Sequence, residues 1–91
     1  MARRLRIKTT PRFDRRLASF LKAHPELVGK TEAAINSLAR TPFDPRNKTH
    51  ALSGPLKGLW AASISYHYRL VFLLSDDEII LVNIGSHDEV Y

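Results

Sequence analysis

The fold is decided by two apolar runs and the acidic turn between them: Tyr68-Arg69-Leu70-Val71-Phe72-Leu73-Leu74, Ser75-Asp76-Asp77 and Glu78-Ile79-Ile80-Leu81-Val82-Asn83-Ile84-Gly85-Ser86. The segments Tyr68–Leu74 and Glu78–Ile84 have the length and composition of central β-strands, and so short a turn joins antiparallel neighbours. A further strand is expected over Leu59–Ser65, where Trp60, Ala62 and Ile64 alternate with small or polar residues. The last third of the chain therefore predicts an antiparallel meander.

The first half of the chain predicts one strand and two helices. Basic and apolar residues alternate over Arg3–Thr9, which is typical of a half-exposed strand. Thr10-Pro11 opens a helix that must stop near His24, because a residue before proline is pushed out of the α region. A second helix is expected from about Lys30 to Arg40. The order β-α-α-β-β-β predicts one α+β domain over residues 1–91, an antiparallel sheet with both helices packed on one face.

Charge is distributed unevenly along the chain. Residues 1–48 carry twelve Lys/Arg and four Asp/Glu, a balance of +8, whereas residues 49–91 carry two and five, a balance of −3. A small basic domain suggests nucleic acid or an acidic protein as partner, although a solvated basic surface is the alternative. No signal peptide, membrane span or cysteine is seen, so we expect a cytoplasmic protein without disulfides or thiolate zinc sites.

Polar residues suited to chemistry lie around the predicted sheet. His50 falls in a long loop over Phe43–Pro55, and loops of that length are often functional. His67 and Arg69 are two residues apart, so they share one face of a strand, opposite the apolar face that should pack on the helices. His87 follows the last strand and could reach the same end of the sheet.

Two histidines and an arginine in a groove are suited to RNA cleavage. One group removes the proton of a ribose 2′-OH, a second protonates the 5′-oxygen, and a cation stabilises the charge on the phosphate. The alternatives are histidines with structural roles, or a metal site, which the spacing disfavours because no helical i, i+4 pair occurs. We interpret His24 as structural or as a helix cap and Trp60 as core. The terminal Tyr91 could stack on a base or fold back as an apolar plug.

Several segments together resemble the RelE/ParE superfamily of bacterial toxins, and most of all its YafQ-type branch. These are the element order, the segment His50-Ala51-Leu52-Ser53-Gly54-Pro55-Leu56-Lys57-Gly58, the strand Tyr68-Arg69-Leu70-Val71-Phe72 and the ending Ile84-Gly85-Ser86-His87-Asp88-Glu89-Val90-Tyr91. The resemblance covers nearly the whole chain. It implies a toxin of a type II toxin-antitoxin system that cuts mRNA in the ribosomal A site without a metal or other cofactor.

The resemblance also implies roles for individual residues. His50 and His87 match an acid/base pair, Tyr91 matches a final aromatic, and Arg69 matches an arginine that holds the scissile phosphate. The chain departs from the branch at His67, where an acidic residue is usual, and at Ser63, where a further histidine is usual. His67 is expected to act as an auxiliary proton carrier or substrate contact. The residues expected to bind ribosomal or messenger RNA are Arg12, Arg15, Arg16, Arg46, Lys48, Lys57 and Tyr91.

The resemblance leaves other functions open. Toxins of the ParE type share the fold but bind DNA gyrase, and they generally lack such a histidine set. A degenerate toxin that still binds its antitoxin is a third reading, prompted by Ser63. In each case the expected partner is a cognate antitoxin in a heteromeric complex. Its acidic, disordered segment would wrap the basic helices and cover or distort the site, folding as it binds. The surface expected to receive it is the basic face of the first helix with the sheet edge.

Overall fold

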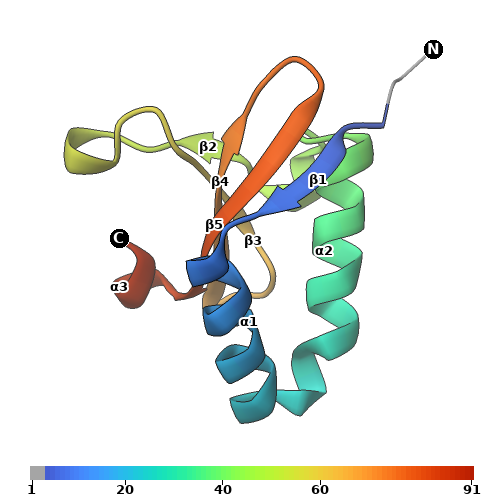
Figure 1. Ribbon diagram of the computed structural model, residues 1–91, viewed down its shortest axis with the longest axis vertical. Coiled ribbons are helices and arrows are strands. Elements are labelled where there is room, and N and C mark those ends of the chain that lie inside the picture. The colour runs from blue at the N-terminus through green and yellow to red at the C-terminus, as the bar shows by residue number, and fades with distance from the viewer. Residues whose placement is uncertain (1–3) are drawn as a thin grey trace.

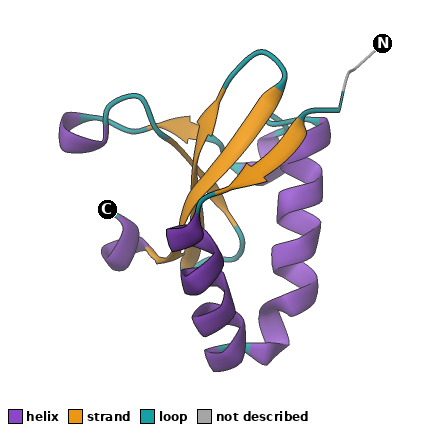
Figure 2. Cartoon of the chain, viewed as in Figure 1, coloured by secondary structure: helices purple, strands orange, loops and turns teal. Residues whose placement is uncertain are grey.

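A twisted β-sheet backed by two long helices forms the protein (Figure 1, Figure 2). The structure is a computed structural model that describes residues 4–91. Within this range the sheet has the strand order β1-β5-β4-β3-β2. The elements are β1 (Arg6–Thr9), α1 (Pro11–Ala23), the 3₁₀ turn η1 (Pro25–Leu27), α2 (Val28–Arg40), η2 (Pro45–Asn47), β2 (His50–Ala51), η3 (Gly54–Leu56), β3 (Trp60–Ser63), β4 (Tyr68–Leu74), β5 (Glu78–Ser86) and α3 (His87–Val90).

The predicted α+β class and the meander of the last three long strands are confirmed. β3 pairs with β4, and β4 with β5, in antiparallel register. The sheet is nevertheless mixed and not wholly antiparallel, because β1 lies parallel to β5, with Arg6 opposite Glu78 and Thr9 opposite Leu81. Both long helices and three strands separate β1 from β5 in the sequence, so the connecting chain is long enough to allow either direction of pairing. The predicted first strand is shorter in the structure, and its first residue, Arg3, lies outside the described range.

Local chemistry sets the helix boundaries. The Thr10 hydroxyl accepts a hydrogen bond from the Phe13 amide at 3.1 Å, and α1 ends at Ala23 with His24 as its C-terminal cap. The His24 ring packs against the rings of Phe20 and Tyr68, which fits the structural role expected for it. The second helix starts at Val28, earlier than expected, because η1 leads directly into it.

The core lies between the two long helices and the inner face of the sheet. Its fully buried side chains include Phe13, Leu38 and Phe72, and Trp60 packs against this cluster as predicted. A register shift between Val71 and Phe72 inserts one extra residue into β5, so Ile84 faces the core although it is an odd number of residues beyond Leu81.

A smaller cluster covers part of the opposite face. Val90 of α3 packs there with Ala61 and Val71, beside Leu52 and Leu59 of the segment around η3. Figure 1 shows α3 and the segment around η3 extending from the same side of the sheet. The C-terminal turn is thus docked on the sheet by its own apolar residue. No helix within residues 4–91 is long and apolar enough to cross a membrane.

Candidate active site

One end of the sheet gathers polar groups from two separate parts of the chain. In the β4–β5 register, Tyr68 lies opposite Ser86 and Arg69 opposite Gly85. Directly beyond this pair, the His87 amide donates to the His67 carbonyl at 3.2 Å. The bend before β4 and the start of α3 are therefore joined. His67, Arg69 and His87 consequently line one open hollow of about 350 Å³, together with Tyr66, Ser86 and Asp88.

Arg69 supports the bend before β4 with part of its guanidinium. Its Nη1 donates to the carbonyls of Ser65 at 2.7 Å, Tyr66 at 3.0 Å and Tyr68 at 3.1 Å. Because all three bonds use one nitrogen, the remaining N–H groups of the fork project from a side chain that is already held in place. The side chain can fix the bend and carry its charge to the hollow at the same time.

Tyr91 lies between two histidines that are far apart in sequence. Its hydroxyl is 3.2 Å from Nε2 of His50, and its ring centroid is 4.3 Å from that of His87, with the ring planes nearly perpendicular. His50 reaches this position because β2 pairs with β3, with His50 opposite Ala61. The structure thus brings His50, Tyr91 and His87 into one row, with Arg69 and His67 beside it.

The hydrogen bonds of His50 select its tautomer. Its Nδ1 is 3.0 Å from the Lys48 carbonyl, which can only accept, so Nδ1 carries a proton. In the neutral ring Nε2 is then the acceptor, and the Tyr91 hydroxyl donates to it. This bond orients a nitrogen that can take up a proton, with Tyr91 as the group that holds the ring.

Charged side chains lie near Tyr91 and His87, the two residues of the row at the C-terminal end of the chain. Burial raises the pKa of the Tyr91 phenol, and the nearby positive charge of Arg69 acts in the opposite direction. Nδ1 of His87 lies 3.5 Å from a carboxylate oxygen of Asp88, and both side chains are largely exposed. The histidine ring is therefore open to a ligand from solvent. Across residues 4–91, no group of three or more His, Cys, Asp or Glu side chains is placed to hold a metal.

The basic residues expected to bind RNA separate into different surroundings. Arg12 lines a second hollow, of about 450 Å³, on whose wall Tyr91 also lies, and Lys57 follows η3. Lys48 is adjacent to the His50 contact through its carbonyl. Arg46 forms a forked ion pair with Asp44 at 2.9 Å, which lowers the pKa of that carboxyl to about 2.

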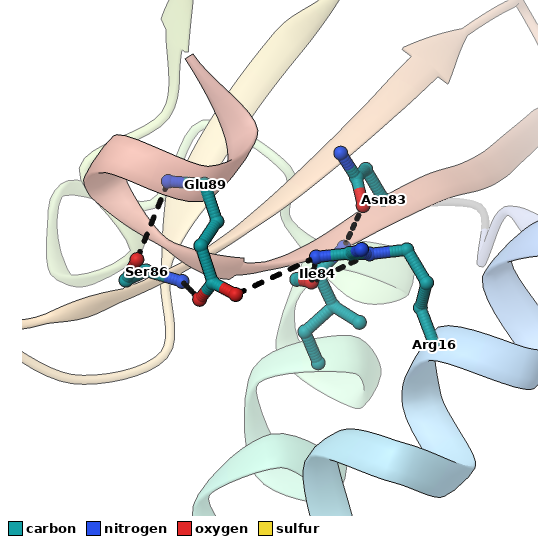
Figure 3. Close-up of polar contacts among 5 residues, drawn as sticks. All are labelled: Arg16, Asn83, Ile84, Ser86 and Glu89. Carbon is teal, nitrogen blue, oxygen red and sulfur yellow. Dashed lines mark hydrogen bonds and ion pairs between the residues drawn. The ribbon is translucent and has the colours of Figure 1, made fainter.

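Arg15 and Arg16 both line a third hollow, beside α1, but their contacts differ. Arg16 points to β5, where it contacts the Ile84 carbonyl and Glu89 (Figure 3). Arg15 is exposed on the helix surface. The two neighbouring arginines therefore have different surroundings: Arg16 contacts β5 and Glu89, whereas Arg15 is exposed.

Helix α3 and the residues that stabilise it were not predicted from the sequence. Ser86 caps this helix by accepting from the Glu89 amide at 3.3 Å, and the Glu89 carboxylate accepts from the Ser86 amide at 2.8 Å (Figure 3). The available signal was the spacing of Ser86 and Glu89, because a serine followed three residues later by glutamate is the signature of a capping box.

The sequence and the fold both match known toxins. The family model described as the bacterial toxin of type II toxin-antitoxin system, YafQ, matches residues 5–91. Toxin YoeB of Escherichia coli strain K12 is 31% identical over 61 residues, which cover 67% of this chain and 73% of that protein. Toxin YoeB of Synechocystis is 28% identical over 68 residues, covering 75% of this chain and 79% of that protein.

Solved structures give the same picture of the fold. The crystal structure of YafQ from E. coli strain BL21(DE3) superposes with a TM-score of 0.82 at 19% identity, covering 96% of this chain and 98% of that one. The solution structure of HP0894 from Helicobacter pylori gives a TM-score of 0.69 at 30% identity and covers 96% and 99% of the two chains. Because the family model spans almost the whole sequence, the chain belongs to the YafQ family of bacterial toxins of type II toxin-antitoxin systems.

Proposed function

We propose that residues 1–91 act as a single toxin domain that cleaves mRNA on the ribosome as a metal-independent endoribonuclease and thereby stops translation. The observation that carries this proposal is the row of His50, Tyr91 and His87 with Arg69 beside it. His67, Arg69 and His87 line one hollow of about 350 Å³, and Tyr91 links the His87 ring to His50, which is not among the residues that line it. A gyrase-binding surface would need no such set.

The proposed reaction is an attack of the ribose 2′-oxygen on the neighbouring phosphorus. One histidine of the His50 and His87 pair removes the proton of the 2′-OH as the new P–O bond forms. The other gives a proton to the 5′-oxygen as the old P–O bond breaks, which leaves a 2′,3′-cyclic phosphate and a 5′-hydroxyl. Each such proton transfer contributes typically about 10²–10⁴-fold to the rate. Arg69 stabilises the additional negative charge on the phosphate oxygens.

His67 and Tyr91 have supporting roles in this scheme. The His67 ring lines the hollow, and its carbonyl holds the His87 amide, so it lies where a second proton carrier or a phosphate contact is needed. Ser63 is opposite Arg69 in the β3–β4 register and offers no imidazole there. Tyr91 orients both rings of the pair and presents an aromatic surface to a base. The proposed RNA contacts on the backbone phosphates are Arg12, Arg15, Arg46, Lys48 and Lys57.

A cognate antitoxin is the proposed protein partner. A chain of the crystal structure of the E. coli DinJ-YafQ toxin-antitoxin complex superposes on this chain with a TM-score of 0.80 at 18% identity. The basic half of the present chain is complementary in charge to an acidic segment that folds on binding. We propose that this segment covers the exposed basic face of α1 and the adjacent edge of the sheet.

Primer extension on an mRNA incubated with purified protein tests the proposal, with and without translating ribosomes. The parent chain should give discrete cuts that depend on ribosomes. The His87→Ala variant should lose them, by about 10²-fold or more in rate, because one proton transfer is missing. Thermal unfolding should stay near that of the parent, since the His87 side chain is 61% exposed.

The contrary outcome is equally definite. If the His87→Ala protein cut mRNA as fast as the parent, the proposed role of His87 in the reaction would be wrong. If the parent gave no cuts with or without ribosomes, the proposed activity would be wrong, and supercoiling by DNA gyrase in the presence of the protein would decide between a gyrase-binding toxin and an inactive one.

A further inference from the structure

The outer edge of β5 has backbone groups that the sheet leaves without a strand partner. β1 pairs with β5 only from Glu78 to Leu81, and past that point α1 lies alongside the strand (Figure 1). In a strand the N–H and C=O of one residue point to the same side, so both polar groups of Ile84 face this edge. Such groups require a partner when they are taken out of water.

Side chains supply the partners of Ile84. Its amide donates to Oδ1 of Asn83 at 2.9 Å, and its carbonyl accepts from Nε and Nη2 of Arg16, each at 3.3 Å (Figure 3). The Arg16 side chain is 35% exposed, which is less than expected for an arginine that extends into solvent to contact RNA. One helix thereby holds the strand that leads into α3.

The same guanidinium reaches the C-terminal turn. Nη2 of Arg16 lies 3.9 Å from a carboxylate oxygen of Glu89, whose other oxygen accepts from the Ser86 amide (Figure 3). These bonds to Ser86 lower the pKa of Glu89, and the charge of Arg16 adds to that effect, so the carboxylate is ionised at neutral pH. Ser86 and Glu89 lie on either side of His87.

Gly85 leaves room for this arrangement. A Cβ added at Gly85 would lie 3.2 Å from Nη2 of Arg16, 3.2 Å from Oε1 of Glu89 and 3.3 Å from Cβ of Glu89. These separations are tighter than ordinary contacts, so a larger residue at this position would require Arg16 or Glu89 to shift by a few tenths of an ångström. Arg16 and Glu89 thus approach the strand closely where it carries a glycine.

We propose that Arg16 is a positioning residue, which acts through the Ile84 carbonyl and Glu89 to fix α3 and so places His87 and Tyr91 for the reaction. The proposal rests on the proposed ribonuclease function. It gives Arg16 a role different from the phosphate contact that its charge suggests. Glu89 is the link between α1 and the cap of α3, because it contacts Arg16 and Ser86 with its two oxygens.

Kinetics of the purified protein on ribosome-bound mRNA separate the two roles of an arginine. For Arg16→Ala we expect kcat to fall by about 10–100-fold, since a displacement of about 1 Å in a reacting group can cost 10²-fold, while KM and its salt dependence stay near the parent values. The matched control is Arg15→Ala, which removes the same charge from the next position of α1. A lost phosphate contact there should raise KM and lower the slope of log affinity against log salt by about 1.

Two further variants test the route through Glu89. Arg16→Lys keeps the charge but not the fork that spans Ile84 and Glu89, so it should restore only part of kcat. Glu89→Ala should lower kcat. The loss of kcat in the double variant Arg16→Ala/Glu89→Ala should be smaller than the product of the two single losses, because each substitution breaks the same connection. Amide exchange at Glu89 and Tyr91 should be faster in Arg16→Ala than in the parent.

Each outcome decides the matter. A raised KM with an unchanged kcat and a lower salt slope in Arg16→Ala would make Arg16 an RNA contact and overturn the proposal, as would unchanged exchange at Glu89 and Tyr91. If the loss of kcat in the double variant equalled the product of the two single losses, Arg16 would not act through Glu89. If the parent cut no RNA, the proposed function would fail, whereas exchange would still report whether Arg16 holds α3.

Discussion

Replacing Arg69 by lysine separates its structural role from the catalytic role that we propose for it. In the parent, Nη1 donates to the carbonyls of Ser65, Tyr66 and Tyr68, and we propose that other N–H groups of the fork contact the phosphate. A lysine has a single nitrogen with three donors. It can replace Nη1 against the carbonyls or contact the phosphate, but it cannot do both at once.

The two roles differ in magnitude. Hydrogen bonds to a charged group contribute about 1.5–3 kcal/mol, and the partial exposure of this bend reduces the total to about 1–2 kcal/mol. Arg69→Ala should therefore lower the melting temperature by about 4–8 °C for each kcal/mol lost, as expected for a domain of this size. Loss of one group that stabilises the transition state costs about 10²–10³-fold in kcat. Arg69→Lys should show that loss in kcat with a melting temperature close to that of the parent.

Thermal unfolding and single-turnover cleavage of the three proteins check this reasoning together. Arg69→Ala should be impaired in both measurements and Arg69→Lys in cleavage alone. The reasoning is refuted if Arg69→Lys cleaves at the parent rate, because a point charge would then suffice. It is also refuted if Arg69→Lys melts as low as Arg69→Ala, since the ammonium would not be holding the bend.

Two further predictions concern the terminal aromatic and the acid limb of stability. Tyr91→Phe removes the hydroxyl that donates to His50 but keeps the ring against His87. The value of kcat should fall by about 2–10-fold, which corresponds to one hydrogen bond of about 0.5–1.5 kcal/mol. A rate equal to that of the parent would show that the bond to His50 does not contribute to cleavage. Asp44 has a pKa of about 2 beside Arg46, below its value of 3.8 when unpaired, so its contribution to stability is complete above about pH 4 and is lost as the pH falls through 2. Asp44→Asn should therefore make the melting temperature fall less steeply between pH 4 and pH 2, and equal slopes in the two proteins would contradict this assignment.

The α+β class and the antiparallel meander were predicted from the sequence, whereas the parallel pairing of β1 with β5 was not. His67 and Arg69 were expected on one open face of a strand from strand parity; both line the same hollow in the structure, but His67 lies in the bend before β4 and not in the strand. The position of His50 beside Tyr91 could not be derived, because it depends on β2, a strand of only two residues inside a loop. The direction of β1 relative to β5 could not be predicted either, because no short turn connects these two strands.

The C-terminal turn was missed for a different reason. Four residues give no hydrophobic periodicity, so α3 cannot be recognised by the pattern that reveals α1 and α2. Its only local signal is the pair Ser86 and Glu89, which stands at the end of an apolar strand and not before an apolar helix. His87 of α3 and Tyr91 directly after it were therefore proposed as candidate site residues without any account of what holds them in place.

Arg15 and Arg16 show why counting charges cannot assign roles. They are adjacent, identical and on the same helix, yet only Arg16 meets the edge of β5. Consecutive residues of an α-helix point about 100° apart, so only one of the two side chains faces the strand. The strand edge is open to it because β1 ends at Thr9 and leaves the outer side of Ile84 without a strand partner, while the other side faces β4. A longer β1 would satisfy the edge by itself and would exclude α1 from it. The short edge strand is thus the feature that lets a side chain of the first helix control the position of residues at the other end of the sequence.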